Sequence, residues 1–481
     1  MDFTPVTHIL GRLITVVGLF MFPSAIVDAY DGGQSGLVFL IVGSLTMVIG
    51  AFISLATSGE RSKGLTVRQS FLLTTGAWTI LPIFGAAPFI FGAPQLDFVN
   101  AYFEAVSGMT TTGATIMTGI EYLPRGVLLW RGILQWLGGL GIVIVAMIFL
   151  PAMRVGGMQF FLTEGFDTLG KILPRALDIA KSLLYVYILL TVVAALAYIA
   201  FGMSTFEGIV HAFTTISTGG FSTSDASFAR YSGPLEYVSS FLMILASLPF
   251  IRFVQLTRGS VVPLYRDIQV RAYLRWIFFS FSAIAIYHWF TSTDPLETVI
   301  RESLFNLVTL FSGTGFVSVD ITTWGAFPLA VAMIVGVVGG CTGSTACSAK
   351  VFRWLVVLES IKAQIRRIHY PNVVSNPRLD GKPLNRGVID SVGSFFTLFF
   401  LTLGITAVLL SLTGLSNETA LTAAWTSVAN IGPAYGPDVG PSGAMDGFPA
   451  AAKWIMIFGM LAGRLEILSV FVLFTASFWR E

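Results

Sequence analysis

The sequence predicts an all-α polytopic membrane protein, in which two N-terminal helices precede four copies of one helical unit. Three observations lead to this prediction. The 481 residues are 54% hydrophobic and only 11% charged, whereas soluble proteins carry about 25% charged residues. Apolar stretches long enough to cross a bilayer recur along the whole chain. Between them lie four shorter apolar segments, each followed by a turn that contains glycine.

The long apolar stretches are the predicted membrane spans, because a helix needs about 20 apolar residues to cross a bilayer. The spans lie near residues 10–29, 36–56, 70–94, 127–152, 180–202, 235–256, 273–291, 326–360, 390–413 and 451–478. We expect the first to be retained and not a signal peptide, because the N-terminus has no basic region and no small-residue cleavage site. The shorter segments near 98–109, 205–216, 297–311 and 418–430 have the length of re-entrant helices.

The basic residues indicate how the spans are oriented, because loops rich in Lys and Arg stay in the cytoplasm. They follow the second, fourth, sixth and eighth spans and include Arg61, Lys63, Arg68, Arg154, Lys171, Arg175, Arg258, Arg266, Arg271, Lys362, Arg366, Arg367, Arg378, Lys382 and Arg386. The loops that contain the short segments have few basic residues and should face outward. An even number of spans then places both termini in the cytoplasm.

One unit recurs four times after the first two spans: a long span, a short apolar segment, a glycine turn and a second long span. The turns are "TTTGAT" (110–115), "ISTGGFS" (216–222), "FSGTGFV" (311–317) and "ANIGPAYG" (429–436). Four unrelated loops could share Gly, Ser and Thr by chance, but all four turns occupy the same place in the unit. The predicted division is 1–58 for the two N-terminal helices, 69–152, 178–257, 270–362 and 388–481 for the four repeats, and 363–387 for a basic cytoplasmic loop.

The four turns could together bind a monovalent cation. Irregular backbone is tolerated at membrane depth only where it lines a watery cavity or is buried in protein. If the four segments meet on one axis, their carbonyl oxygens form rings that can replace the hydration shell of an ion. Glycine allows the positive φ angles that such a turn requires, and Thr and Ser hydroxyls add further oxygens. Uncharged rings suit potassium better than magnesium, which dehydrates reluctantly.

The order of these parts resembles the Trk/Ktr/HKT superfamily of potassium transporters, and most closely its bacterial TrkH-type membrane subunit. The resemblance covers nearly the whole chain and implies a pseudo-four-fold pore with a potassium selectivity filter. The implied filter residues are Thr111, Thr112, Gly113, Ser217, Thr218, Gly219, Gly220, Gly313, Thr314, Gly315, Asn430, Ile431 and Gly432. The fourth turn departs most from the pattern, because Ile431 and Pro433 flank its glycine, and a strictly four-fold filter is not expected.

The eighth span is interrupted by small residues, in "VAMIVGVVGGCTGSTACSAKVFRWLV". Glycines lower helical propensity there. One reading is a close crossing of two helices, and the other is a loop within the membrane below the filter. The resemblance favours a loop that obstructs the pore and is followed by a basic residue. The implied gate residues are Gly339, Gly340, Cys341, Thr342, Gly343, Ser344, Thr345, Ala346 and Lys350.

Arg464 lies deep in the last predicted span, where a charge is costly and faces a cavity or a partner. Glu466 follows two residues later and points elsewhere on a helix. Arg464 could bond carbonyl oxygens to stabilise the fold, or restrain cation flux beside the pore. The resemblance favours the second role and adds Arg464 to the gate, and the two roles are compatible.

Other polar residues receive more modest assignments. His211 and Glu104 are expected to support the filter by hydrogen bonding. Asp225, Asp320 and Asp438 either concentrate cations at the pore mouth or are ordinary loop residues. Cys341 and Cys347 are expected to be packing residues and not a disulfide. The basic segment 361–386 could follow the positive-inside rule alone, bind anionic lipid, or dock a soluble regulator.

The sequence favours a transporter over an enzyme, because its four histidines are scattered and no catalytic cluster is evident. A secondary transporter with inverted repeats fits less well, since all four short segments fall on one predicted side. A sodium-dependent Ktr-type subunit is the nearest alternative. No nucleotide-binding motif or bound cofactor is expected in this chain. The resemblance implies a cytosolic TrkA-type ring that binds nucleotides, a homodimer, contact with membrane lipid and no nucleic acid, in the bacterial inner membrane.

Overall fold

The computed structural model describes residues 2–33, 35–58, 65–153, 176–373, 376–465 and 467–480. These residues form an all-α membrane protein, and the only strands among them are the two-residue β1 (Arg378–Leu379) and β2 (Lys382–Pro383). The helices before the first glycine turn and in the first repeat are α1 (Thr4–Leu19), α2 (Phe22–Tyr30), α3 (Ser35–Ala56), α4 (Val67–Phe91), α5 (Phe98–Met109) and α6 (Arg125–Met153).

The other three repeats continue the same order of elements. The second contains α8 (Ala176–Ala200), α9 (Thr205–Ile216), α10 (Pro234–Ala246) and α11 (Phe250–Leu256), and α12 (Val262–Arg266) leads to the third. The third contains α13 (Ile268–Thr291), α14 (Leu296–Ser312), α15 (Ala326–Val338) and α16 (Val351–His369). The fourth contains α17 (Arg386–Ser411), α18 (Asn417–Ala429), α19 (Ala450–Arg464), α20 (Ile467–Leu473) and α21 (Ala476–Trp479).

Fewer helices than the ten predicted meet the length and hydropathy expected of a membrane span. Among the described residues six helical segments do so, or eight if the bent pairs α10–α11 and α19–α20 each count as one. The bends measure 94° and 112°. The predicted span 326–360 is not one helix: α15 has 13 residues, and the chain leaves the helical conformation from Gly339 to Lys350.

Side chains at the helix starts explain where several of these helices begin. In α4 and α9 a hydroxyl accepts the third backbone N–H, and a Gln or Glu side chain accepts the N–H of the capping residue. These capping boxes pair Thr66 with Gln69 and Ser204 with Glu207. Each box satisfies backbone donors that the helix itself leaves unpaired. Ser416 caps α18 with its hydroxyl oxygen, which accepts the Thr419 amide without a reciprocal side-chain bond.

The four short helices α5, α9, α14 and α18 form the centre of the molecule. Each second helix of a repeat packs against the short helix of its own repeat and against that of the next. The pairs are α6 with α5 and α9, α10 with α9 and α14, α15 with α14 and α18, and α19 with α18 and α5. Because α19 returns to α5, the four repeats close into a circle.

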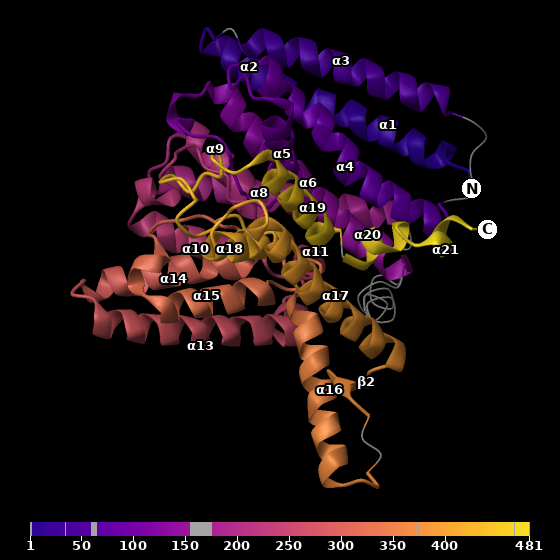
Figure 1. Ribbon diagram of the computed structural model, residues 1–481, viewed down its shortest axis with the longest axis vertical. Coiled ribbons are helices and arrows are strands. Elements are labelled where there is room, and N and C mark those ends of the chain that lie inside the picture. Colours follow the sequence, from indigo (N-terminus) through magenta and orange to yellow (C-terminus); the bar gives the residue numbers. More distant parts are fainter. Residues whose placement is uncertain are drawn as a thin grey trace.

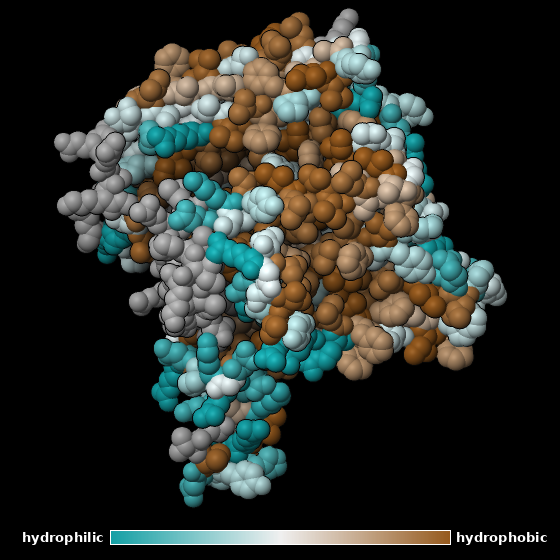
Figure 2. Space-filling view, turned by 180° about the vertical axis from the view of Figure 1, so that it is seen from behind, coloured by the Kyte–Doolittle hydropathy of each residue, from teal (hydrophilic) through white to brown (hydrophobic). Residues whose placement is uncertain are grey.

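The N-terminal helices lie at one side of this circle, against α4 and α6 (Figure 1). Asp28 in α2 is buried and accepts a hydrogen bond from the Gly126 amide at the start of α6. On another side, α16 and the β1–β2 hairpin extend away from the helical body (Figure 1). Figure 2 shows that this extension is largely hydrophilic, whereas the face above it is broadly hydrophobic. The contrast fits a helical body in lipid and an extension in water.

Candidate functional site

The four turn glycines lie in one ring. A Cβ atom placed on Gly113 would lie 2.1 Å from the carbonyl oxygen of Gly219. The equivalent atom on Gly220 would lie 1.9 Å from the Thr314 oxygen, and that on Gly315 2.0 Å from the Ile431 oxygen. Gly432 completes the circle, since its Cβ would lie 2.8 Å from the Thr112 oxygen. Each glycine therefore contacts the residue that precedes the glycine of the adjoining repeat.

The backbone of all four turns has the same conformation. The glycines have φ angles of +84° at Gly113, +78° at Gly220, +80° at Gly315 and +114° at Gly432. The residue two positions earlier is also left-handed in every repeat, at Thr111 (+52°), Thr218 (+52°), Gly313 (+74°) and Asn430 (+53°). Only the third repeat uses glycine at that earlier position. Non-glycine residues are uncommon there, so the surrounding structure must hold Thr111, Thr218 and Asn430 in place.

The short helices hold the turns through one repeated hydrogen bond. The residue before each glycine donates its N–H to the carbonyl five residues earlier, in the last turns of the helix. The pairs are Thr112 to Ser107 (2.9 Å), Gly219 to Thr214 (2.7 Å), Thr314 to Thr309 (2.9 Å) and Ile431 to Thr426 (3.1 Å). The N–H groups thus bond back into the helices. The carbonyls of these four residues instead meet the adjoining repeats, at the C-terminal, partly negative ends of the helices.

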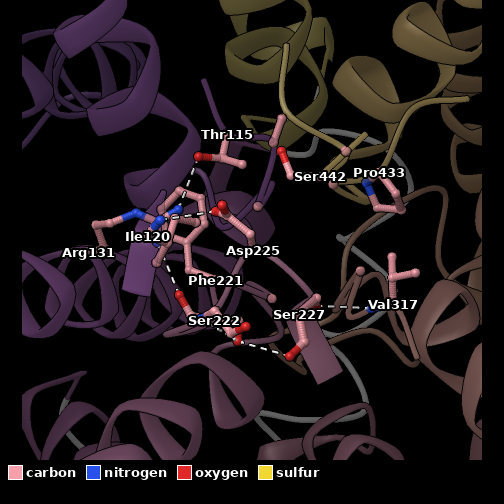
Figure 3. A pocket seen from close by; sticks show the side chains of 17 residues that line it. Thr115, Ile120, Arg131, Phe221, Ser222, Asp225, Ser227, Val317, Pro433 and Ser442 are labelled. Atoms are coloured by element: carbon pink, nitrogen blue, oxygen red, sulfur yellow. Dashed lines mark hydrogen bonds between the residues drawn. The ribbon is translucent and has the colours of Figure 1, made fainter. Parts of the chain in front are cut away.

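A cavity of about 70 Å³ is lined by all four turn glycines (Figure 3). It adjoins a larger vestibule of about 710 Å³, and both are lined by Asp225 and Pro433. Asp320 and Glu418 add two more carboxylates to the wall of the vestibule. The ring therefore lies at the base of a vestibule that has three carboxylates in its wall.

The predicted acidic residues also have structural partners. Asp225 accepts hydrogen bonds from the Gly119 and Ile120 amides, at 2.7 and 3.1 Å. Asp320 caps a short helical turn through the Thr322 amide. Asp438 accepts from Ser416, and hydrogen bonds from Ser416 lower the pKa of Asp438. Asp225 and Asp320 therefore stabilise their loops and also line the vestibule, whereas Asp438 is not among the residues that line either cavity.

A buried ion pair supports the first two turns from behind. Arg131 Nε lies 2.8 Å from Glu104 Oε1, and the two side chains are 1% and 0% exposed. Arg131 also donates to the Ser222 carbonyl and to Thr115 Oγ1, and its guanidinium lies over the Phe221 ring (Figure 3). Glu104 was expected to support the filter, and it accepts the Ile116 amide just after the first turn. Arg131 was not singled out from the sequence.

His211 lies behind the second turn and has partners on both ring nitrogens. Nδ1 lies 2.8 Å from the Glu207 carbonyl oxygen, and Nε2 lies 3.1 Å from Ser222 Oγ. The ring is fully buried among Tyr198, Phe228 and Phe316. These contacts favour the supporting role over a proton relay, because both ring nitrogens have hydrogen-bond partners and the ring is fully buried.

The segment from Gly339 to Lys350 lies on the helix side of the ring, below the turns, and contacts every repeat. Thr345 Oγ1 donates to the carbonyls of Ile216 and Ala246 in the second repeat, at 2.9 and 3.0 Å. Ser348 Oγ donates to the Ala429 carbonyl in the fourth, at 3.0 Å. Cys347 Sγ lies 3.7 Å from Thr111 Oγ1 in the first. We call residues 339–350 the intramembrane loop.

The loop is anchored at both of its ends. The Cys341 amide donates to the Ser247 carbonyl, and the Phe250 amide donates to the Gly343 carbonyl. Near the far end, the Val351 amide donates to the Gly340 carbonyl. Lys350 is buried with φ +69°, and its Nζ lies 3.5 Å from the Ser344 carbonyl oxygen. Cys341 and Cys347 are both buried and free, as expected from the sequence.

Arg464 ends α19 and reaches the loop. Its Nη1 donates to the Thr345 carbonyl at 3.3 Å and to Cys347 Sγ at 2.9 Å. The residue is 4% exposed, and Nε and Nη2 have no hydrogen-bond partner among the described residues. No carboxylate pairs with it within that part of the chain, and Glu466 lies outside the described residues, as do Arg61, Lys63, Arg154, Lys171 and Arg175. Arg464 therefore bonds a carbonyl and has no counter-charge among the described residues.

Besides Arg131, three features of this site were not predicted from the sequence. The left-handed conformation of Thr111 and Thr218 has no signal in residue type, since Thr is rare in that region, whereas Asn430 is of a type that is enriched there. The Asn430 side chain bonds Thr112 Oγ1 across the boundary between the fourth and first repeats. Gln135 in α6 bonds the second turn. Spacing could not reveal these contacts, although a buried Gln in an apolar span is itself a signal.

Comparisons with known proteins cover nearly the whole chain. The TrkH family model, described as a cation transport protein, matches residues 36–481. The Trk system potassium uptake protein TrkI of Halomonas elongata is 39% identical over 99% of this chain and 97% of that protein. The Trk system potassium uptake protein TrkH of Escherichia coli K12 is 33% identical over the full length of both. The crystal structure of the potassium transporter TrkH from Vibrio parahaemolyticus superposes with a TM-score of 0.91 at 28% identity, over all of both chains.

Proposed function

Because this chain is a multi-pass membrane protein of the TrkH family that takes up potassium, we propose that the ring of four turns is its selectivity filter. The observation that carries this proposal is the cyclic contact between each turn glycine and the carbonyl of the adjoining repeat. Four peptide segments that close on one axis can surround a single ion with carbonyl oxygens. The proposed filter residues are the ones that the sequence predicts in the four turns, of which Thr111 is the first and Gly432 the last.

Potassium would enter from the acidic vestibule. Asp225, Asp320 and Glu418 attract cations there, and the 70 Å³ cavity above the glycines is large enough for a partly hydrated ion. Exchanging hydration water for carbonyl oxygens costs least for a weakly hydrated monovalent cation, and the ring carries no formal charge that would retain a divalent one.

The intramembrane loop and Arg464 are the proposed gate. The loop bonds the carbonyls of Ile216 and Ala429, the last residues of α9 and α18, directly below the filter. Arg464 holds the loop through the Thr345 carbonyl and places a buried positive charge beside it. An ion that leaves the filter would meet both. Lys350 closes the segment and belongs to the same gate.

Regulation would come from another chain. The α16 helix and the β1–β2 hairpin carry exposed basic residues and extend from the helical body (Figure 1), which suits docking of a cytosolic TrkA-type nucleotide-binding ring. The relatives are named as parts of a Trk system, which fits a membrane subunit with partners. The proposal includes a homodimer in the bacterial inner membrane, both termini in the cytoplasm, and the division into repeats given above.

Growth of a potassium-uptake-deficient bacterium at low potassium tests the filter. We expect the unaltered chain to restore growth and Gly315→Ala to fail, because the added methyl group would meet the Ile431 carbonyl and φ is +80°. Gly404→Ala is the matched control, since nothing lies within 4 Å of its Cβ position. Immunoblots of the membrane fraction confirm equal amounts. Normal rescue by Gly315→Ala would remove the filter assignment.

A further inference from the structure

Gly219 breaks the side-chain pattern of the proposed filter. The residue before the filter glycine is Thr112, Thr314 and Ile431 in the other three repeats, whereas the second repeat has no side chain there. Gly219 does not need to be glycine for its backbone, because its φ lies outside the left-handed region. The space for a side chain is already filled: a Cβ atom on Gly219 would lie 2.3 Å from Cδ of Gln135.

Gln135 comes from α6 of the first repeat and is fully buried. Its Nε2 donates to the Gly219 carbonyl at 2.6 Å, and its Oε1 accepts from the Phe221 amide at 3.1 Å. The Phe221 amide can only donate, so it fixes Oε1 on its own side and leaves Nε2 facing Gly219. The side-chain amide of Gln135 thus bonds the chain on both sides of Gly220.

This contact singles out one of four equivalent carbonyls. The Gly219 oxygen lies against Gly113 in the ring, as the Thr314, Ile431 and Thr112 oxygens lie against their neighbours. Among the described residues, the carbonyls of Thr112, Thr314 and Ile431 accept no hydrogen bond, whereas that of Gly219 accepts a short one. A donor on a carbonyl uses part of the oxygen's capacity to bind a cation.

We propose that Gln135 is a positioning residue that sets the ion preference of the filter, by holding the Gly219 carbonyl and weakening it as a ligand. The inference rests on the proposed filter. A carbonyl of lower field strength favours potassium over the smaller sodium ion, and a held strand resists collapse around sodium. Loss of the Gln135 side chain would strengthen the Gly219 carbonyl as a ligand and would release the strand. Both changes would increase the uptake of sodium relative to potassium.

Gln135→Leu tests this, because leucine retains an apolar body of similar length and removes both hydrogen-bonding groups. Uptake of potassium and sodium would be measured in proteoliposomes with purified full-length protein, as KM and maximal rate for each ion. We expect the potassium preference to fall by roughly two- to tenfold, the range that corresponds to one lost hydrogen bond.

Asn306→Leu is the matched control. Asn306 is an equally buried amide that bonds Ser318 after the third turn, but it bonds no filter carbonyl. The Asn306→Leu protein should be less stable, but its preference for potassium over sodium should not change. An unchanged preference in Gln135→Leu, or an equal change in both variants, would overturn the inference.

A second pair of variants guards against misfolding. Gly219→Thr alone should lose uptake, because its side chain would overlap Gln135, whereas Gly219→Thr combined with Gln135→Ala should regain it. No gain in the double variant would contradict the pairing. Gly315→Ala separates the two proposals: if it transports normally the filter itself is wrong. If it is inactive and Gln135→Leu keeps the original ion preference, only the role of Gln135 fails.

Discussion

Arg464 Nη1 donates a hydrogen bond to Cys347 Sγ across 2.9 Å, so a charge in the fourth repeat touches the intramembrane loop of the third. The same nitrogen donates to the Thr345 carbonyl. Two other guanidinium nitrogens are buried without a partner in the described residues. A buried charge with no counter-charge among the described residues raises the energy of a cation nearby, which is the role proposed for Arg464 in the gate.

Arg464→Gln should raise cation flux. Glutamine can still donate to the loop, but it removes the charge that opposes a passing cation. We expect rubidium uptake into proteoliposomes to increase severalfold. Arg252→Gln is the control, because Arg252 is ion-paired with Asp267 and lies outside the proposed gate. Equal or lower flux in a folded Arg464→Gln protein would count against a gating charge.

Thr345→Val should also raise flux, by loosening the loop. Valine keeps the shape of threonine but loses the bonds to the Ile216 and Ala246 carbonyls. The single hydroxyl proton of Thr345 is shared between these two carbonyls, so its bonding stabilises the loop by about 0.5–1.5 kcal/mol. Removal of residues 340–346 should have a larger effect in the same direction. Thr402→Val, at a buried hydroxyl that has no partner in the described residues, should leave uptake unchanged.

The four filter glycines should differ in their tolerance of alanine. The Cβ of Gly113→Ala, Gly220→Ala or Gly315→Ala would lie 1.9–2.1 Å from a carbonyl oxygen, against 2.8 Å for Gly432→Ala. All four share the strain of a positive φ. We expect Gly432→Ala to retain measurable rubidium uptake in whole cells, while each of the others loses at least tenfold. The reverse order would show that the contact distances do not govern the effect.

Replacing only one partner of the Glu104–Arg131 ion pair should lower the stability of the protein more than replacing both. Arg131→Met leaves the Glu104 carboxylate buried without its partner, and such losses destabilise proteins by about 3–5 kcal/mol. The double variant Glu104→Gln/Arg131→Met removes both charges and should be less destabilised. Thermal unfolding of the detergent-solubilised proteins measures the difference. A double variant that is less stable than Arg131→Met would contradict this account.

The arrangement of the repeats could be predicted from the sequence because local residue patterns mark each of their parts. Short apolar segments, small residues near Gly339 and the recurring glycines predict re-entrant helices, a break in α15–α16 and four left-handed turns, and the structure has these features. The contacts of Gln135 and Asn430 could not be predicted, because each joins two repeats that are distant in the chain. The packing of the repeats determines these contacts, whereas the periodicity of the sequence indicates only the helix face on which a side chain lies.

Four repeats in one polypeptide need not be identical. The boundary between the first and second repeats has a residue pair that the other boundaries lack. Gln135 fits only because Gly219 leaves it room, and neither residue recurs at the other boundaries. In an assembly of four separate identical subunits, any change at this position would appear four times, and every ligand of the ion would alter together. A fused chain can change one of the four positions alone, as Gly219 and Gln135 do at this boundary.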